Sequence, residues 1–293
     1  SFSSELQKEV QKLNAKISSA DLVGRKDLRK EITFTIDPED AKDFDDAISI
    51  RFVSDTKIKL GVHIADVGHY VKAGSNIDQE AFLRAFSVYF PGKVVPMLPE
   101  RLSNLLCSLR PNEDKLCFSI LIEITNFHKI GSVWMGKTII NSKKRFTYEG
   151  AQNLIKTQKG VFNKELSALN QIAQNLRKKR IKNGSINFER TDIVFELNEI
   201  KEPVRVLEKT SLDSHKLVEE FMLLANRLVA NALSNLKLSI YRVHDLPDIE
   251  KLKELSVYLK HFNCKKINTN MPRKTLAATI NDIIVFPLPT SPC

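Results

Sequence analysis

A short apolar segment that runs directly into a dense group of carboxylates constrains this chain more than any other feature of its sequence. Residues 32–36 are apolar or β-branched and predict a strand. Carboxylates packed closely repel one another and raise one another's pKa unless a cation neutralises them. The strand end is therefore either a solvated loop or a cation site, in a chain whose formal net charge is +10. Six acidic residues follow the strand within ten positions: Asp37, Glu39, Asp40, Asp43, Asp45 and Asp46.

The spacing of these carboxylates excludes two common motifs. A calcium loop of the EF-hand type has Gly at its sixth position, but counting from Asp37 reaches Lys42 and counting from Asp43 reaches Ile48. A phosphoaspartyl DxD motif does not begin at Asp37. Two-metal phosphoryl chemistry needs carboxylates that converge on cations about 3.5–4 Å apart, and this arrangement is compatible with the spacing. A solvated acidic loop is equally compatible, so the spacing alone leaves both interpretations open.

Composition places the chain among soluble globular proteins, with 42% apolar and 27% charged residues. No apolar segment reaches the roughly 18 residues of a membrane span, and the first twenty residues lack the apolar core of a signal peptide. Four cysteines without CxxC spacing indicate reduced thiols in place of structural zinc. We therefore expect a cytoplasmic protein without a membrane segment. A pI near 9.3 favours a polyanionic partner.

Periodicity predicts an α+β fold, with strands concentrated in the first half and helices in the second. Residues 47–53 and 58–67 predict an antiparallel pair beside the strand that precedes Asp37. Gly131 is expected to mark the turn of a further hairpin. Strands are predicted at 118–127, 133–141, 186–197 and 203–208, a polar connection at 21–30, and helices at 4–16, 77–88, 99–107, 148–156, 164–183, 212–236 and 249–261.

The segment TIDPEDAKDFDDAISI at 35–50 resembles the signature of the ribonuclease II/ribonuclease R (RNB) family of 3′→5′ exoribonucleases. Within that family the resemblance is closer to ribonuclease R and covers roughly residues 21–263. It implies an RNB-type catalytic domain, with a mixed or antiparallel sheet surrounded by helices. The resemblance continues in GVHIADVGHYV (61–71), SVYFPGKVVPMLPERLSNLLCSL (87–109), RFTY (145–148), GSINFE (184–189), HKLVEEFMLLANRLVAN (215–231) and YRVHDLP (241–247).

The resemblance also suggests how the chain is divided. We predict an N-terminal helical extension at 1–20, the RNB catalytic domain at 21–270 and a tail of uncertain structure at 271–293, with no cold-shock or S1 domain in this chain. In the family, the catalytic domain continues into a TSPIRR-like motif whose arginine contacts the phosphate at the active site. Residues 289–293 read PTSPC and no arginine follows them. The expectation is thus a catalytic domain that is incomplete at its C-terminus.

The family assigns roles to the aspartates residue by residue. Asp37, Asp43 and Asp46 match the residues that bind Mg²⁺, and Asp45 matches the aspartate most closely tied to cleavage. The implied activity is Mg²⁺-dependent hydrolysis of single-stranded RNA from its 3′ end, which releases nucleoside 5′-monophosphates. A truncated, catalytically impaired fragment that binds metal and RNA without turnover is the alternative. A non-enzymatic acidic loop on a basic scaffold protein is a third, weaker reading.

The same resemblance implies an RNA path. Tyr89 and Phe188 match aromatic residues that clamp the terminal bases, Tyr148 matches a tyrosine near the ribose, and Glu219 matches a glutamate linked to preference for RNA. From spacing alone, each clamp aromatic is ordinarily a core residue and the glutamate a solvated or salt-bridged one. The role of His244 stays open.

Two basic clusters, Lys143–Arg145 and Arg177–Lys182, either line the approach of RNA or stabilise the fold, and His63 fits a core histidine. The implied partner is single-stranded RNA, without a membrane partner or a small-molecule cofactor. We expect the chain to be a monomer.

Overall fold

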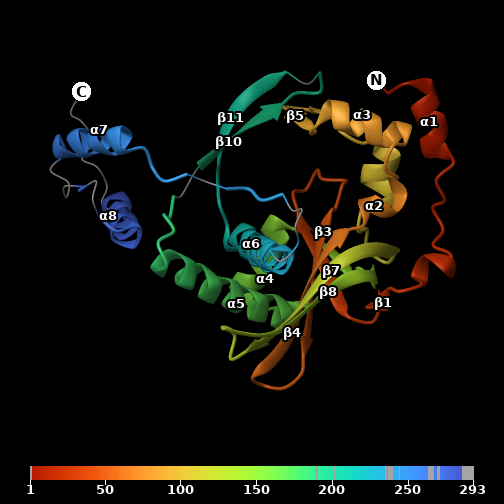
Figure 1. Cartoon of the computed structure of the whole chain (residues 1–293), viewed down its shortest axis with the longest axis horizontal. Coiled ribbons are helices and arrows are strands. Elements are labelled where there is room, and N and C mark those ends of the chain that lie inside the picture. Colours follow the sequence, from red (N-terminus) through yellow and green to blue (C-terminus); the bar gives the residue numbers. More distant parts are fainter. Residues whose placement is uncertain are drawn as a thin grey trace.

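The computed structural model of the chain describes residues 2–188, 191–200, 202–234, 236, 240–243, 245–262, 267–268 and 271–285. Seven of its strands form a central sheet, and two further pairs of strands form separate hairpins (Figure 1). The strands are β1 (Lys26–Asp27), β2 (Ile32–Asp37), β3 (Asp46–Phe52), β4 (Lys57–Ala65), β5 (Val88–Phe90), β6 (Lys93–Val95), β7 (Asp114–Thr125), β8 (Lys129–Asn141), β9 (Lys144–Thr147), β10 (Thr191–Leu197) and β11 (Pro203–Thr210).

The central sheet has seven strands in the order β1-β8-β7-β4-β3-β2-β9. Strand β1 pairs with β8, and β2 with β9, in parallel. The neighbours between β8 and β2 are antiparallel, so the sheet is mixed. The predicted α+β class and the predicted β3–β4 pair beside β2 are confirmed. Strands β5–β6 and β10–β11 form separate antiparallel pairs.

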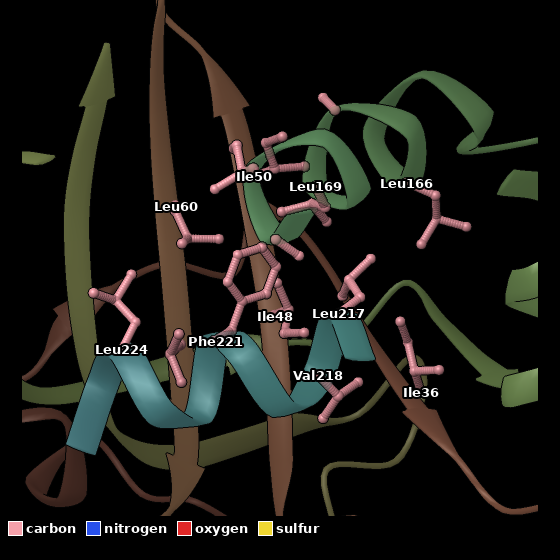
Figure 2. Packing of buried hydrophobic residues seen from close by; sticks show 14 of the residues in the cluster. Ile36, Ile48, Ile50, Leu60, Leu166, Leu169, Leu217, Val218, Phe221 and Leu224 are labelled. Atoms are coloured by element: carbon pink, nitrogen blue, oxygen red, sulfur yellow. The ribbon is translucent and has the colours of Figure 1, made fainter. Parts of the chain in front are cut away.

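Three helices cover one face of the sheet: α4 (Tyr148–Thr157), α5 (Asn163–Lys182) and α6 (Asp213–Leu233). In Figure 2 the ring of Phe221 on α6 lies against Ile48 and Leu60 of the central strands. The buried residues of α6 include Leu217, Phe221 and Leu224, which recur at helical spacing on one face. This buried stripe fixes the rotation of α6, and thereby which of its polar residues face away from the core.

The opposite face of the sheet is covered by the N-terminal part of the chain. Helices α1 (Ser4–Gln11), α2 (Val67–Tyr70) and α3 (Asn76–Arg84), with the π-helical turn η2 (Arg101–Leu106), enclose a second apolar cluster that includes Leu6 and Val10. A short 3₁₀ turn, η1, spans Ala20–Leu22. The Ser75 side chain accepts a hydrogen bond from the backbone N–H of Asp78 and so caps the start of α3.

Several predicted boundaries are wrong for identifiable reasons. The β7–β8 hairpin turns at Asn126 and Phe127, with φ of 52° and 59°, whereas Gly131 lies inside β8. Two successive positive-φ residues suit a tight hairpin, and an asparagine supplies the first without a glycine. Helix α3 ends at Arg84, because Ala85 takes a φ of 65° and the next residues lead into β5.

Several short elements were not predicted, among them β5, β6, β9 and α2, and two further omissions change the description of the fold. The polar connection at 21–30 contains β1, which joins the sheet through β8. Part of the tail at 271–293 forms α8 (Arg273–Val285), whose Leu276 packs with Leu259 of α7 (Ile249–Lys260). Within the described ranges, none of the helices has the length and apolar character needed to cross a bilayer. The described thiols of Cys107 and Cys117 are free and buried, while Cys264, Cys293, His244 and residues 286–293 lie outside the described residues.

Candidate active site

The acidic segment is a loop between two neighbouring strands. Asp37 is the last residue of β2 and Asp46 is the first of β3, and these strands are antiparallel neighbours. The chain therefore returns to the same edge of the sheet, and the loop at 38–45 carries Asp43 and Asp45 between the two ends. The side chain of Asp37 is buried, and among the described residues its Oδ2 atom makes no well-formed hydrogen bond.

Burial and mutual repulsion shift the acid–base behaviour of this loop. Burial, together with the charges of Asp45 and Asp37, raises the pKa of Asp46 to about 7. Burial raises the pKa of Asp37 to about 6, although the Thr35 hydroxyl and a nearby guanidinium partly offset the rise. The pKa of Asp45 is raised by desolvation and by the charge of Asp43. The four carboxylates thus influence one another electrostatically, as the sequence pattern predicts.

The loop is fixed to the body of the protein by Ser108, which is buried just after η2. Its hydroxyl accepts a hydrogen bond from the backbone N–H of Phe44 at 3.1 Å and donates one to the carbonyl of Lys42 at 2.8 Å. The backbone N–H of Leu109 donates to the carbonyl of Phe44 at 2.7 Å. The acidic loop is therefore held in one backbone conformation by the segment that follows η2.

Arg145 holds the other side of the loop. It lies on β9, which pairs in parallel with β2, so its side chain reaches past the end of β2. Its Nη2 atom donates to the carbonyls of Pro38 and Glu39, the latter at 2.8 Å. The charge of Arg145 also lowers the pKa of Asp37. The basic cluster in which Arg145 lies was interpreted as an RNA path or a stabilising feature, and the structure shows this member anchoring the acidic loop.

The acidic loop offers a set of oxygen donors for a divalent cation. Among the described residues, no three His, Cys, Asp or Glu side chains converge closely enough to share an ion as they stand, so joint coordination requires side-chain movement. The oxygen-only donors are nevertheless those that Mg²⁺ prefers. Asp37 Oδ2 is buried without a partner in the described part of the chain, and its pKa is raised by burial. These properties fit a carboxylate group whose charge a cation neutralises.

Tyr148 lies beside the acidic loop. It is the first residue of α4, and its ring stacks on that of His215 in α6, with centroids 3.8 Å apart and planes 12° apart. Burial, together with the charges of Asp46, Asp37 and Asp45, raises the pKa of the Tyr148 hydroxyl to about 12.

His215 was not singled out from the sequence. Its Nδ1 atom accepts a hydrogen bond from the backbone N–H of Leu212 at 3.2 Å, which fixes the ring that Tyr148 stacks on. The sequence does contain one indication of its role. His215 and Glu219 are four residues apart and therefore lie on the same face of α6.

The two predicted clamp aromatics are exposed. Tyr89 lies on β5 with 67% of its surface exposed, and its hydroxyl donates to Asp43 Oδ2 at 3.4 Å. Phe188 follows α5 and is 62% exposed. Neither ring is a core residue, which is the alternative that spacing alone favoured. Their contact with RNA stays a prediction.

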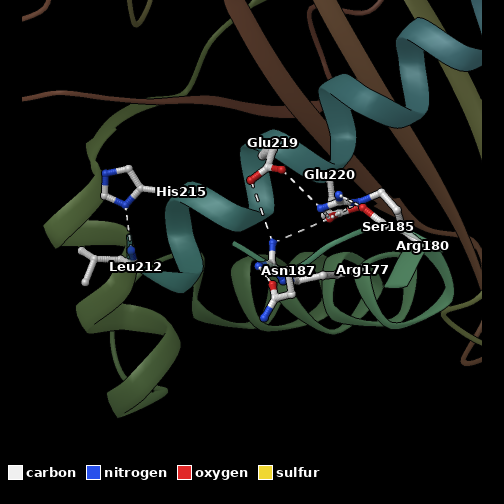
Figure 3. A network of polar contacts seen from close by, with 8 residues as sticks. All are labelled: Arg177, Arg180, Ser185, Asn187, Leu212, His215, Glu219 and Glu220. Atoms are coloured by element: carbon white, nitrogen blue, oxygen red, sulfur yellow. Dashed lines mark hydrogen bonds and ion pairs between the residues drawn. The ribbon is translucent and has the colours of Figure 1, made fainter. Parts of the chain in front are cut away.

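Phe188 and Glu219 line one cavity of about 220 Å³. Figure 3 shows the polar network in its wall, where Glu219 and Glu220 of α6 meet Arg177 and Arg180 of α5. The predicted Arg177–Lys182 cluster therefore contributes two of its cations to ion pairs. The structure thus brings Phe188 to Glu219, and Tyr89 and Tyr148 to the acidic loop.

Comparison with known proteins identifies the family of the chain. A family model described as the RNB domain matches residues 25–286. Ribonuclease R from Thermotoga maritima is 39% identical over 287 residues, which cover 94% of this chain and 40% of that protein. Ribonuclease R from Chlamydia pneumoniae is 42% identical over 233 residues, covering 79% of this chain and 34% of that protein.

A solved structure of Mycoplasma genitalium RNase R in complex with ribose-methylated single-stranded RNA superimposes with a TM-score of 0.91 at 29% identity. The superposition covers 99% of this chain and 46% of that one. The chain thus spans less than half the length of each of these three proteins.

Proposed function

The chain belongs to the RNB domain family, and from that premise we propose that it is the catalytic part of a Mg²⁺-dependent 3′→5′ exoribonuclease. Its substrate is single-stranded RNA, and its product is a nucleoside 5′-monophosphate. The observation that carries the proposal is the group of interacting carboxylates at the end of β2, in the loop at 38–45 and at the start of β3, beside Tyr148. The relatives named ribonuclease R and the RNA-bound neighbour support the choice of substrate.

In this proposal, each part of the site has a separate task. Asp37, Asp43 and Asp46 hold the cation, which when bound lowers the pKa of a water molecule and offsets charge on the phosphate. The carboxylate of Asp45 accepts a hydrogen bond from the attacking water and so orients it toward the phosphorus. Arg145 keeps the loop backbone in place while these side chains move.

The RNA end is recognised by rings and by one carboxylate. Tyr89 and Phe188 stack on the terminal bases, since a base–aromatic stack contributes about 1–3 kcal/mol. The ring of Tyr148, supported by His215, lies against the ribose. Glu219 accepts a hydrogen bond from the 2′-hydroxyl, which is the group that distinguishes RNA from DNA.

The deciding experiment replaces Asp45 with Asn, which keeps the shape of the side chain and removes its charge. With Mg²⁺ and a 5′-labelled single-stranded oligoribonucleotide, we expect the wild-type chain to release mononucleotides from the 3′ end. The Asp45→Asn variant should lose at least about 100-fold in rate, as expected for removal of a general-base-type contact, and should bind RNA with unchanged affinity.

Asp40→Asn is the matched control, because Asp40 lies in the same loop and is exposed. It removes the same charge and should retain the wild-type rate. A wild-type chain that binds RNA and Mg²⁺ without releasing nucleotides would establish the alternative, a binding fragment without turnover. The cytoplasmic location and the monomeric state of the chain stay predictions.

A further inference from the structure

One guanidinium group joins three parts of the cavity wall. Arg180 lies near the C-terminal end of α5, and its Nε and Nη2 atoms donate to Glu220 Oε1 at 3.0 and 2.5 Å. Nη2 also donates to Glu219 Oε1 at 3.2 Å, and Nη1 donates to Ser185 Oγ at 2.8 Å. Helix α5, helix α6 and the loop after α5 are therefore linked through a single side chain (Figure 3).

Glu220 fixes the position of that guanidinium. Only 1% of its surface is exposed, so water cannot solvate its charge. A buried carboxylate is tolerated when a well-placed cation and hydrogen bonds compensate the lost solvation. The planar fork of arginine makes two bonds to one carboxylate, which the point charge of lysine does not reproduce. With Arg180 held by Glu220, its remaining donors point in fixed directions, to Glu219 and Ser185.

The loop that leads to Phe188 is held by further contacts. Arg177 Nη2 donates to Asn187 Oδ1 at 2.5 Å. On the other side, Asn281 of α8 accepts a hydrogen bond from the backbone N–H of Asn187 at 2.7 Å and donates one to the carbonyl of Ser185 at 3.0 Å. The residue just before Phe188 is therefore restrained from two directions.

We propose that Arg180 is a positioning residue that, anchored by Glu220, holds the Glu219 carboxylate in one rotamer in the cavity that Phe188 also lines, so that Glu219 discriminates ribose from deoxyribose. The inference rests on the proposed function of Glu219 and Phe188. Half of the Glu219 side chain is exposed, and an exposed glutamate otherwise samples several rotamers. Holding it in one rotamer before RNA arrives lowers the entropic cost of the hydrogen bond to a 2′-hydroxyl. Arg180 itself need not contact RNA.

The test uses two labelled oligonucleotides that differ only in the 3′-terminal sugar, ribose in one and 2′-deoxyribose in the other. Binding is measured by fluorescence anisotropy in EDTA, so it does not depend on turnover. We expect the wild-type chain to prefer the ribose end by about tenfold or more, the size of a hydrogen bond to a charged group. In Arg180→Met the preference should fall below about twofold, through weaker binding of the ribose oligonucleotide alone.

Two further variants separate positioning from other effects. Lys179→Met removes an exposed cation from the same helical turn and should keep the wild-type preference. Asn281→Ala frees the Phe188 loop without touching Glu219, so it should weaken both oligonucleotides equally and leave their ratio unchanged. If Lys179→Met reduced the preference for ribose as much as Arg180→Met does, the preference would depend on the positive charge of this helical turn and not on the position of Glu219.

Arg180→Met leaves Glu220 buried without its main cation, so the variant should lose stability. The double variant Arg180→Met/Glu220→Met removes both charges together, which is often neutral for folding. Thermal unfolding followed by circular dichroism verifies that it folds. A folded double variant that keeps the ribose preference would overturn the inference.

Failure of this inference is distinguishable from failure of the proposed function. A wild-type chain that prefers the ribose end and does not digest RNA leaves the positioning role of Arg180 intact and refutes the catalytic proposal. A chain that digests RNA with no preference for the terminal ribose refutes the positioning role and supports catalysis.

Discussion

At the scale of single residues, the carboxylates of the acidic loop lower the stability of the fold at neutral pH. Asp46 has a pKa of about 7 in the folded chain, raised from its ordinary value of 3.8 by burial and by the charges of Asp45 and Asp37. Between these values the folded state binds more protons than the unfolded state, so the free energy of unfolding decreases as pH rises through the window from 3.8 to about 7. The cost of charging Asp46 is fully present above that window.

Asp46→Asn should therefore stabilise the chain at pH 8 when EDTA removes divalent cations. One pKa unit corresponds to about 1.4 kcal/mol, so we expect a gain of at least about 1 kcal/mol at pH 8 that disappears near pH 4. Urea unfolding at several pH values measures it. Added Mg²⁺ should stabilise the wild-type chain and not the variant. Asp40→Asn, an exposed change in the same loop, should show no such dependence on pH, and an equal gain there would contradict the explanation.

The sequence indicates that these aspartates are important, but it gives no indication of the residues that hold their loop in place. Asp37, Asp45 and Asp46 stand out because six acidic residues fall within ten positions of the chain, so their mutual repulsion can be inferred from the sequence itself. Arg145 is about a hundred positions away and meets the loop only because β9 pairs with β2. A contact that depends on a parallel pairing between distant segments leaves no local pattern.

At the scale of elements, a chain of buried polar groups crosses the centre of the sheet. The ring of His63 on β4 is hydrogen-bonded to Ser49 Oγ of β3 at 2.8 Å and to Ser119 Oγ of β7 at 2.7 Å. Burial lowers the pKa of His63 to about 3, so the ring is neutral. The expectation that His63 is a core histidine is confirmed by its zero exposure. Gly61, two residues earlier on the same face, leaves room for the ring.

Gly61→Ala should destabilise the sheet. A Cβ atom at Gly61 would lie 2.3 Å from Ser49 Oγ and 2.7 Å from His63 Nε2, so the ring would have to move and its hydrogen bonds would be lost. We expect a cost of about 1–3 kcal/mol in the free energy of unfolding, the usual range for overpacking. Gly131→Ala, in the same sheet, places its Cβ 3.4 Å from the nearest atom and should cost less than half as much. Equal costs would show that backbone freedom, not space, explains Gly61.

Element types followed from periodicity, and element ends did not. Strands β2, β3 and β4 and the buried stripe of α6 were predicted because core-facing positions repeat at the strand or helix period. The β7–β8 turn was misplaced because Asn126 adopts the conformation expected of Gly131. Helix α8 was missed because the proline-rich sequence after it suggested an irregular tail.

At the scale of the whole molecule, two kinds of recognition are combined. The net charge of +10 attracts any polyanion, with a strength that depends on salt. In the cavity near Phe188, the positive charge of Arg180 is paired with the carboxylates of Glu219 and Glu220. General attraction and sugar discrimination therefore arise from different residues, and salt should affect only the first.

The affinity of the wild-type chain for single strands should fall steeply with salt while its sugar preference stays constant. Each phosphate that is neutralised contributes a slope of about −0.7 in log K against log salt, so a few contacts lower affinity by at least about tenfold between about 50 and 200 mM KCl. Oligonucleotides ending in ribose and deoxyribose carry equal numbers of phosphates and should give parallel lines. Arg180→Met should bring the two lines together without changing their slope, because its charge is compensated within the cavity wall. If the sugar preference of the wild-type chain decreased with salt, the discrimination would be electrostatic. That result would contradict the proposal that Glu219 recognises the ribose through its uncharged 2′-hydroxyl.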